Sequence, residues 1–328
     1  MKDSPRMIDV FTHISPPKFT ALLEKKSQRP SYYAQANAAT PALWDLDARL
    51  RVLEKFPGRR EILSLATPPV EHVTTPTDAV ELAKIANEEM AEMVEKHPDF
   101  FAGAIACLPM NDTDAALKEV DRAIRDLHFK GVQISSSING KPLDRPEFMG
   151  LYQKMAAYDL PIWIHPVRDS DIPDYPDENE SLYALCSTFG WPFETTLAMS
   201  RLVYSGVLEK YPDLKIITHH CGGMVPYFAQ RVALKKSDPT VKIPRPPIDY
   251  FHKFYGDTAL GGNAPALMCG CAFFGAERIL FATDYPYSGP AGEKKVVLTI
   301  EAINAMDITA EDKEKIFLKN AQRLLHLS

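Results

Sequence analysis

Eight short apolar runs alternate with helical patterns along the whole chain, and this alternation limits the fold more than any other feature. The runs begin at Met7, Ile62, Phe101, Gly131, Pro161, Leu214, Phe254 and Arg278. Strands that alternate with helices predict a parallel sheet, because each crossover helix returns the chain to the same edge. Eight such units in 328 residues favour a closed α/β architecture, the (β/α)8 TIM barrel, over an open sheet. No G-x-G-x-x-G pattern follows the first run, which argues against a dinucleotide-binding fold.

The order of the segments indicates one continuous domain. No linker or low-complexity segment divides the chain, so we expect a single barrel domain over residues 1–328. A polar, Pro-containing insertion at 15–44 follows the first run, and Asp45 is placed to cap a helix over Leu46–Phe56. The C-terminal portion, 291–326, has a helical pattern.

Composition and charge exclude several classes of protein. The chain has 37 Lys and Arg against 43 Asp and Glu, a net charge of −6, and no basic block, so no nucleic-acid partner is expected. No uninterrupted apolar run approaches the length of a membrane span, so no membrane-spanning segment is expected. The five cysteines are odd in number and scattered, which fits reduced thiols and a cytoplasmic protein.

Histidines and an aspartate stand at the ends of four apolar runs. In a barrel, functional residues lie at the C-terminal ends of the strands. His13 follows the first run, His165 ends the fifth, and Asp284 follows the eighth. Of His219 and His220 after the sixth run, strand alternation predicts that one points inward and the other away. We assign the site to His220, because the following Cys-Gly-Gly allows close backbone approach. Imidazoles and a carboxylate together predict a metal or proton-transfer site.

Longer motifs give the sequence a resemblance to a known family. They are Met7–His13, Pro161–Pro166, Pro192–Met199, Ser205–Pro212, His220–Tyr227 and Phe281–Pro286. Over nearly its whole length the chain resembles the amidohydrolase-superfamily decarboxylases, a group that includes aminocarboxymuconate-semialdehyde decarboxylase and γ-resorcylate decarboxylase. The resemblance implies a (β/α)8 barrel with one divalent metal, commonly Zn²⁺ or Mn²⁺. It also implies non-oxidative decarboxylation of a small hydroxy-aryl or unsaturated oxo carboxylic acid.

The resemblance implies a role for each residue that matches the family motifs. His13, His165 and Asp284 stand at metal-ligand positions, and His220 stands at the position of the general acid/base histidine. Asp284 or His220 would deliver a proton to the carbon that loses CO₂. Arg231 matches an arginine that binds the substrate carboxylate in a neighbouring subunit's site. Because the family often forms dimers or tetramers, a homodimer or homotetramer is expected.

The sequence departs from the family pattern at Phe11. The first strand of the family ends in His-x-His or Glu-x-His, and Phe11 stands at the first of these positions. A phenyl ring has no lone pair, so that ligand is lost, and the ring is expected to line the substrate site beside His165. Asp9 lies deeper on the same face, and we interpret it as a structural hydrogen-bonding group. Two imidazoles and one carboxylate still form a plausible catalytic metal site.

Two other functions are compatible with this sequence. The first is a metal-independent hydrolase, like the lactonases of the same superfamily. In it, Asp284 would activate water, and the substrate carboxylate would be bound by His13, His165 and Arg231. Its activity would survive chelation, and its products would retain every carbon. In the second, the chain is a non-catalytic or specialised subunit of a hetero-oligomer, and a partner with an intact His-x-His would be encoded beside it.

Overall fold

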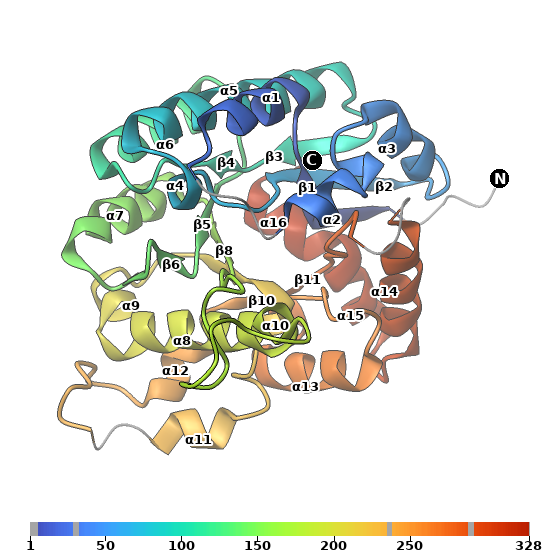
Figure 1. Cartoon of the computed structure of the whole chain (residues 1–328). Coiled ribbons are helices and arrows are strands. Elements are labelled where there is room, and N and C mark those ends of the chain that lie inside the picture. Colours follow the sequence, from blue (N-terminus) through green and yellow to red (C-terminus); the bar gives the residue numbers. More distant parts are fainter. Residues whose placement is uncertain (1–5, 29–32, 235–237, 288–291, 328) are drawn as a thin grey trace.

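A computed structural model describes residues 6–28, 33–234, 238–287 and 292–327, and it contains a strand within each of the eight expected runs (Figure 1). The barrel strands are β1 (Met7–Ile14), β2 (Arg59–Leu65), β3 (Phe101–Ala104) with β4 (Ala106–Cys107), β5 (Val132–Ser135), β8 (Ile162–His165), β9 (Ile216–Thr218), β10 (Tyr255–Asp257) and β11 (Ile279–Leu280). All neighbouring pairs among them are parallel. The predicted (β/α)8 architecture is therefore confirmed.

Backbone hydrogen bonds close the strands into a ring. The order is β1-β2-β3 in one sheet and β4-β5-β8-β9-β10-β11 in the other, and β4 follows β3 after Ile105. At the opposite seam, the N–H of Val10 donates to the carbonyl of Phe281 at 2.9 Å. The N–H of His13 donates to the carbonyl of Tyr285 at 2.7 Å. The eighth strand thus returns to the first, and all strand C-termini meet at one mouth.

Helices surround the strands (Figure 1). Those that follow barrel strands are α3 (Leu46–Leu53), α5 (Pro76–Lys96), α6 (Thr113–Arg125), α7 (Met149–Tyr158), α8 (Trp191–Tyr204), α11 (Ala229–Ala233), α13 (Ala264–Phe274) and α14 (Glu293–Ala305). Shorter elements are α4 (Val70–Val73), α9 (Val207–Lys210), α10 (His219–Gly222), α12 (Pro247–Phe251), α15 (Ala310–Glu314), α16 (Asn320–Leu325), β6 (Ser137–Ile138) and β7 (Lys141–Pro142). Among the described residues, none of these helices is both long and apolar enough to cross a bilayer.

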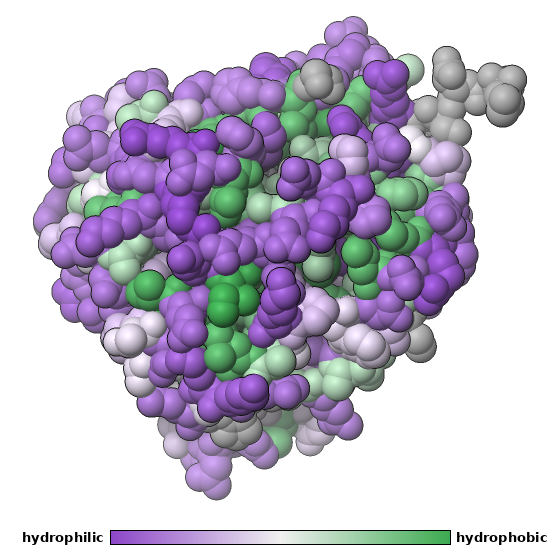
Figure 2. All heavy atoms as spheres, turned by 90° about the horizontal axis from the view of Figure 1, so that it is seen from above, coloured by the Kyte–Doolittle hydropathy of each residue, from purple (hydrophilic) through white to green (hydrophobic). Residues whose placement is uncertain are grey.

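The insertion after β1 contains more regular structure than its composition suggests. It holds α1 (Pro17–Lys26) and α2 (Ala34–Ala38), and α1 packs against α5. The predicted N-cap of α3 is confirmed, since the Asp45 carboxylate accepts the N–H of Ala48 at 3.0 Å. Figure 2 shows the face that carries α1 and α5, at the top of Figure 1, as largely hydrophilic. This is the surface expected for amphipathic helices that turn their apolar sides to the barrel.

A buried ion-pair network holds the first strand to its neighbours. Asp9 pairs with Arg59 at 2.6 Å, and Arg59 in turn pairs with Glu61 at 2.8 Å. Asp9 also accepts the N–H and the hydroxyl of Thr283, at 3.0 and 2.6 Å. The structural interpretation of Asp9 is therefore confirmed. Because Thr283 directly precedes Asp284, this network also fixes where that carboxylate leaves the eighth strand.

Candidate active site

Three imidazoles and one carboxylate lie together at the mouth of the barrel. The ring centroid of His165 lies 5.2 Å from that of His13 and 5.4 Å from that of His219. The Oδ1 atom of Asp284 lies 3.2 Å from His13 Nε2 and 3.5 Å from His219 Nε2. All four residues are buried. The structure thus brings together His13, His165 and Asp284, as the strand ends predicted, and adds His219.

The expectation that only one of the neighbouring histidines points into the site is wrong. The ring centroids of His219 and His220 are 3.9 Å apart, and both residues lie at the mouth. Strand β9 ends at Thr218, so the alternation of side chains no longer applies to the residues after it. His220 has a left-handed backbone conformation with φ of 53°, which turns its ring to the same side as that of His219. In the sequence, the signal for both site residues was that His219 and His220 directly follow the sixth apolar run.

The hydrogen bonds of His13 and His165 determine which ring nitrogen faces the site. Ser64 donates its hydroxyl to the Thr12 carbonyl at 3.0 Å, so its oxygen accepts the Nδ1–H of His13 at 3.1 Å. The Nδ1 of His165 lies 2.7 Å from the Pro166 carbonyl, which can only accept. Each ring is therefore protonated on Nδ1 and keeps a lone pair on Nε2. Burial lowers the pKa of His13 and holds that of His165 well below its usual range, which favours these neutral rings.

His219 is held by a second aspartate that sequence reasoning did not assign. Its Nδ1 lies 2.5 Å from the carboxylate of Asp257, at the end of β10. The other oxygen of Asp257 accepts the backbone N–H groups of Cys221 and Ala259, at 3.0 and 3.2 Å. Burial opposes a charge on His219, but Asp257 and Asp284 outweigh it and raise the pKa to about 9. The position therefore favours a positive charge between the two carboxylates, which a bound cation would supply in place of the Nε2 proton of His219.

Asp284 is an ionised group in this arrangement. Its second oxygen makes an ion pair with the ammonium of Lys295 on α14. Burial alone would raise the pKa of Asp284, but the Lys295 ammonium and the His219 ring hold it well below its usual range. An aspartate that stays ionised is a poor proton donor.

His220 differs from the other three histidines in its surroundings. It is only partly buried, and its ring stacks on Trp191 with centroids 6.2 Å apart. Its Nδ1 has no hydrogen-bond partner among the described residues. Burial and the neighbouring His219 keep the pKa of His220 well below its usual range. The ring is therefore neutral, and neither its tautomer nor its orientation is fixed by a protein acceptor.

Phe11 packs beneath the histidine rings. Its centroid lies 4.2 Å from that of His219, 4.9 Å from that of His13 and 5.7 Å from that of His165. The side chain is fully buried in the barrel interior. It therefore forms an apolar floor at the place where the family pattern has a ligand.

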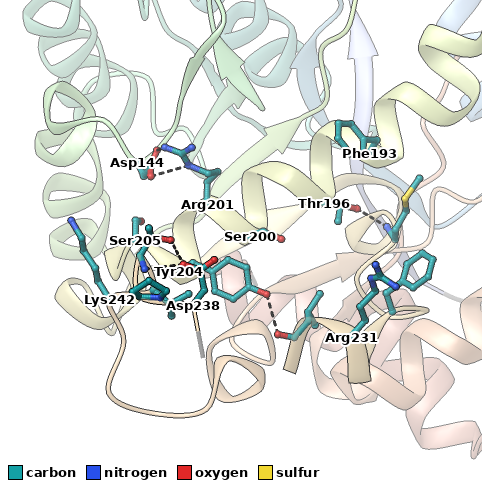
Figure 3. A pocket seen from close by; sticks show the side chains of 16 residues that line it. Asp144, Phe193, Thr196, Ser200, Arg201, Tyr204, Ser205, Arg231, Asp238 and Lys242 are labelled. Carbon is teal, nitrogen blue, oxygen red and sulfur yellow. Dashed lines mark hydrogen bonds and ion pairs between the residues drawn. The ribbon is translucent and has the colours of Figure 1, made fainter. Parts of the chain in front are cut away.

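Arg231 lies apart from this cluster. It is exposed on α11 and lines a cavity of about 1120 Å³ between α8, α11 and residues 238–242. Figure 3 shows Arg231 and Lys242 at opposite ends of this cavity. None of the residues that line the cavity belongs to the histidine cluster. Within one chain, Arg231 is thus not part of the site that contains His13.

A narrow cleft beside His165 contains an unexpected acid. Glu71 of α4 lines it together with Cys107, Gln133 and Ser135. The Glu71 carboxyl is buried, and it accepts the hydroxyl of Ser135 at 3.4 Å. Burial raises the pKa of Glu71 to about 7. Nothing in the sequence pattern marked this residue, because it lies on a short helix after β2 and not at a strand end.

The cluster has the donor set of a divalent-metal site. Among the described residues, one ligand atom each from His13, His165 and His219 lies within 4.8 Å of the others, and the same holds for His219, His220 and Asp284. The Nε2 atoms of His13 and His219 are buried and form no hydrogen bond with any residue that the structure describes. Imidazole nitrogens with their Nδ1–H groups held by acceptors are typical of metal ligands. The residues present therefore fit such an ion.

Comparison with known proteins gives consistent relatives. A family model described as amidohydrolase matches residues 8–327. The chain is 32% identical over 297 residues to γ-resorcylate decarboxylase from Polaromonas sp., covering 86% of this chain and 87% of that one. It is 30% identical to 2-amino-3-carboxymuconate-6-semialdehyde decarboxylase from Dictyostelium discoideum, and the match covers 87% of this chain and 77% of that enzyme. The chain also aligns with a crystal structure of dihydroxybenzoic acid decarboxylase from Polaromonas sp., which contains bound manganese and the inhibitor 2-nitroresorcinol. The TM-score is 0.81 and the sequence identity 29%, and the alignment covers 98% of this chain and 97% of that chain. These are the enzymes that the sequence motifs resemble.

Proposed function

Because the chain belongs to the amidohydrolase family, we propose that it catalyses the non-oxidative decarboxylation of a small hydroxy-aryl carboxylic acid. The observation that carries the proposal is the convergence of His13, His165, His219 and Asp284 at one barrel mouth. The relatives that cover most of the chain are decarboxylases. An unsaturated oxo acid is the second substrate class, since one of these relatives acts on a muconate semialdehyde.

The walls of the site suit an aromatic acid. Phe11 lies under the histidine rings, and Trp191 lies beside His165 and His220, with ring centroids 5.6 and 6.2 Å apart. Aromatic side chains stack favourably on a flat substrate ring and exclude water from it. The imidazoles among these rings supply the polar partners that a carboxylate needs.

We assign a divalent cation, Mn²⁺ or Zn²⁺, to His13, His165 and Asp284. Manganese is bound in the similar Polaromonas structure, and the buried Nε2 lone pairs of this chain provide the matching donors. A bound cation would polarise the substrate carboxylate and the oxygen beside it. The ammonium of Lys295 holds Asp284 ionised and so keeps an oxygen available as a ligand.

His220 is the group that we assign to proton transfer. Decarboxylation of a hydroxy-aryl acid needs a proton at the ring carbon that carries the carboxylate. Once that proton is added, the bond to the carboxylate breaks, its electrons return to the ring, and CO₂ leaves. His220 is partly exposed and its tautomer is not fixed, so it can take up a proton at the mouth and deliver it inward.

We further propose that the enzyme acts as a homodimer or homotetramer in the cytoplasm. Arg231 stands on a surface with exposed Tyr227, Phe228 and Leu234, outside its own chain's histidine cluster. A second copy would cover these apolar side chains and could receive Arg231 as a partner for the substrate carboxylate. The five cysteines are all free thiols, which agrees with a reducing compartment.

The test is a product analysis with 2,6-dihydroxybenzoate, the substrate named for a relative, and with 6-methylsalicylate. We expect release of CO₂ and a phenolic product with one carbon fewer, and loss of turnover after exhaustive chelation that added Mn²⁺ restores. Turnover that survives chelation and yields products with every carbon would instead establish the metal-independent hydrolase. The Lys295–Asp284 ion pair is the observation that favours that second candidate, because it supplies a positive charge without a metal.

A further inference from the structure

We infer that His219 supplies the metal ligand that Phe11 removes, so that the site is formed by His13, His165, His219 and Asp284. The lost donor would thus be replaced from the sixth strand of the barrel and not from the first. The inference rests on the proposed function, because it takes the divalent cation of that proposal as its ligand.

The first observation is the position of the two rings. The Phe11 centroid lies 4.2 Å from that of His219, with the rings in an edge-to-face arrangement at 78°. Both side chains are fully buried. The imidazole therefore stands directly against the side chain that took the ligand position. Phe11 also limits the motion of His219, because a buried aromatic contact restricts the ring to one orientation.

The second observation is the hydrogen bonding of His219. Its Nδ1 is bound by Asp257, whose other oxygen is anchored by the backbone N–H groups of Cys221 and Ala259. Its Nε2 is buried, forms no hydrogen bond within the described part of the chain and lies 3.5 Å from Asp284 Oδ1. A carboxylate that holds Nδ1 while Nε2 meets a cation is the usual arrangement around a metal-bound histidine. Asp257 is then a positioning residue.

The third observation is the contrast with the next residue. Among the residues with described positions, no carboxylate or carbonyl meets the buried Nδ1 of His220, and the residue is more exposed than His219. A ring without such an orienting acceptor is suited to proton exchange and less suited to ligation. The neighbouring histidines therefore divide the two tasks, with ligation at His219 and proton transfer at His220.

The donor set that results has three imidazole nitrogens and one carboxylate oxygen. Such a set suits Zn²⁺ and accepts Mn²⁺. The ligands come from four strand ends, those of β1, β8, β9 and the eighth strand, and each is anchored by its own hydrogen bonds or ion pair. The substitution at Phe11 is thus compensated without any change of fold.

The test measures metal affinity of the apoprotein, with Mn²⁺ and Zn²⁺ titrated against a chromophoric chelator. We expect His219→Ala to weaken binding by more than about 100-fold and Asp257→Asn by about 10- to 100-fold, the range typical of partners that orient a ligand. The matched control is His220→Ala, which should change affinity by less than about 3-fold while removing turnover. The double variant Phe11→His/His219→Ala should recover affinity, because it restores the family arrangement. Circular dichroism checks that each variant is folded.

The outcomes separate this inference from the proposed function. If the wild-type chain binds neither cation yet is folded, the metal proposal itself fails. If the wild-type chain binds Mn²⁺ and His219→Ala binds it equally well, only the role of His219 is overturned. Equal losses in His219→Ala and His220→Ala would also overturn the division between the two rings. Continuous-wave electron paramagnetic resonance spectra of bound Mn²⁺ should change in His219→Ala and stay unchanged in His220→Ala.

Discussion

Replacing Glu71 with glutamine is expected to remove a large pH dependence of folding stability. The carboxyl is 5% exposed on α4, and the weak contact with Ser135 at 3.4 Å does little to offset its burial. Its pKa is raised from 4.5 to about 7. The folded state therefore holds the proton more tightly than the unfolded chain does.

The sign and size of the pH effect on folding stability follow from the difference between the pKa of Glu71 in the folded and in the unfolded state. Stability from the neutral acid is fully present below pH 4.5 and is lost as the pH rises through about 7, because ionised Glu71 must then remain buried. The difference between 4.5 and about 7 corresponds to about 3 kcal/mol, at about 1.36 kcal/mol for each factor of ten. Between pH 5 and pH 8 the expected loss of folding stability is about 2 to 3 kcal/mol.

Urea unfolding followed by far-ultraviolet circular dichroism measures this loss. The free energy of unfolding is compared at pH 5 and pH 8 for the wild type and Glu71→Gln, whose side chain cannot ionise. Glu54→Gln, at an exposed position on the end of α3, is the matched control and should keep the wild-type slope. Groups elsewhere titrate equally in all three proteins and cancel in the difference. Identical pH slopes for the wild type and Glu71→Gln would refute a buried acid at this position.

Three further substitutions test the site and its support. Asp284→Asn should abolish turnover and leave the circular dichroism spectrum unchanged, since it removes a charge held by Lys295 and two imidazoles; near-normal turnover would contradict its role. Asp9→Asn should lower the free energy of unfolding by about 3 kcal/mol in urea, because it leaves the buried Arg59 without one of its carboxylates. Arg231→Ala should raise KM for the acid with little change in kcat, and light scattering should show the same oligomer; an unchanged KM would remove Arg231 from substrate binding.

The sequence determined the barrel and the mouth at which the site is built. Strand alternation and helix periodicity are local properties, so eight apolar runs and the cap at Asp45 could be recognised without tertiary contacts. Because parallel strands end at one edge, the positions of His13, His165 and Asp284 after their runs were enough to predict that they converge. The motifs around them predicted the family to which the chain belongs.

Only the tertiary structure decided which groups complete the site. The choice between His219 and His220 depended on where β9 ends and on Asp257, which lies 38 residues further along the chain from His219. The low pKa of Asp284 depends on Lys295 of a later helix, and the raised pKa of Glu71 depends on burial in a cleft. Hydrogen-bond partners and desolvation arise from contacts between distant segments, and the local pattern of a single sequence does not contain them.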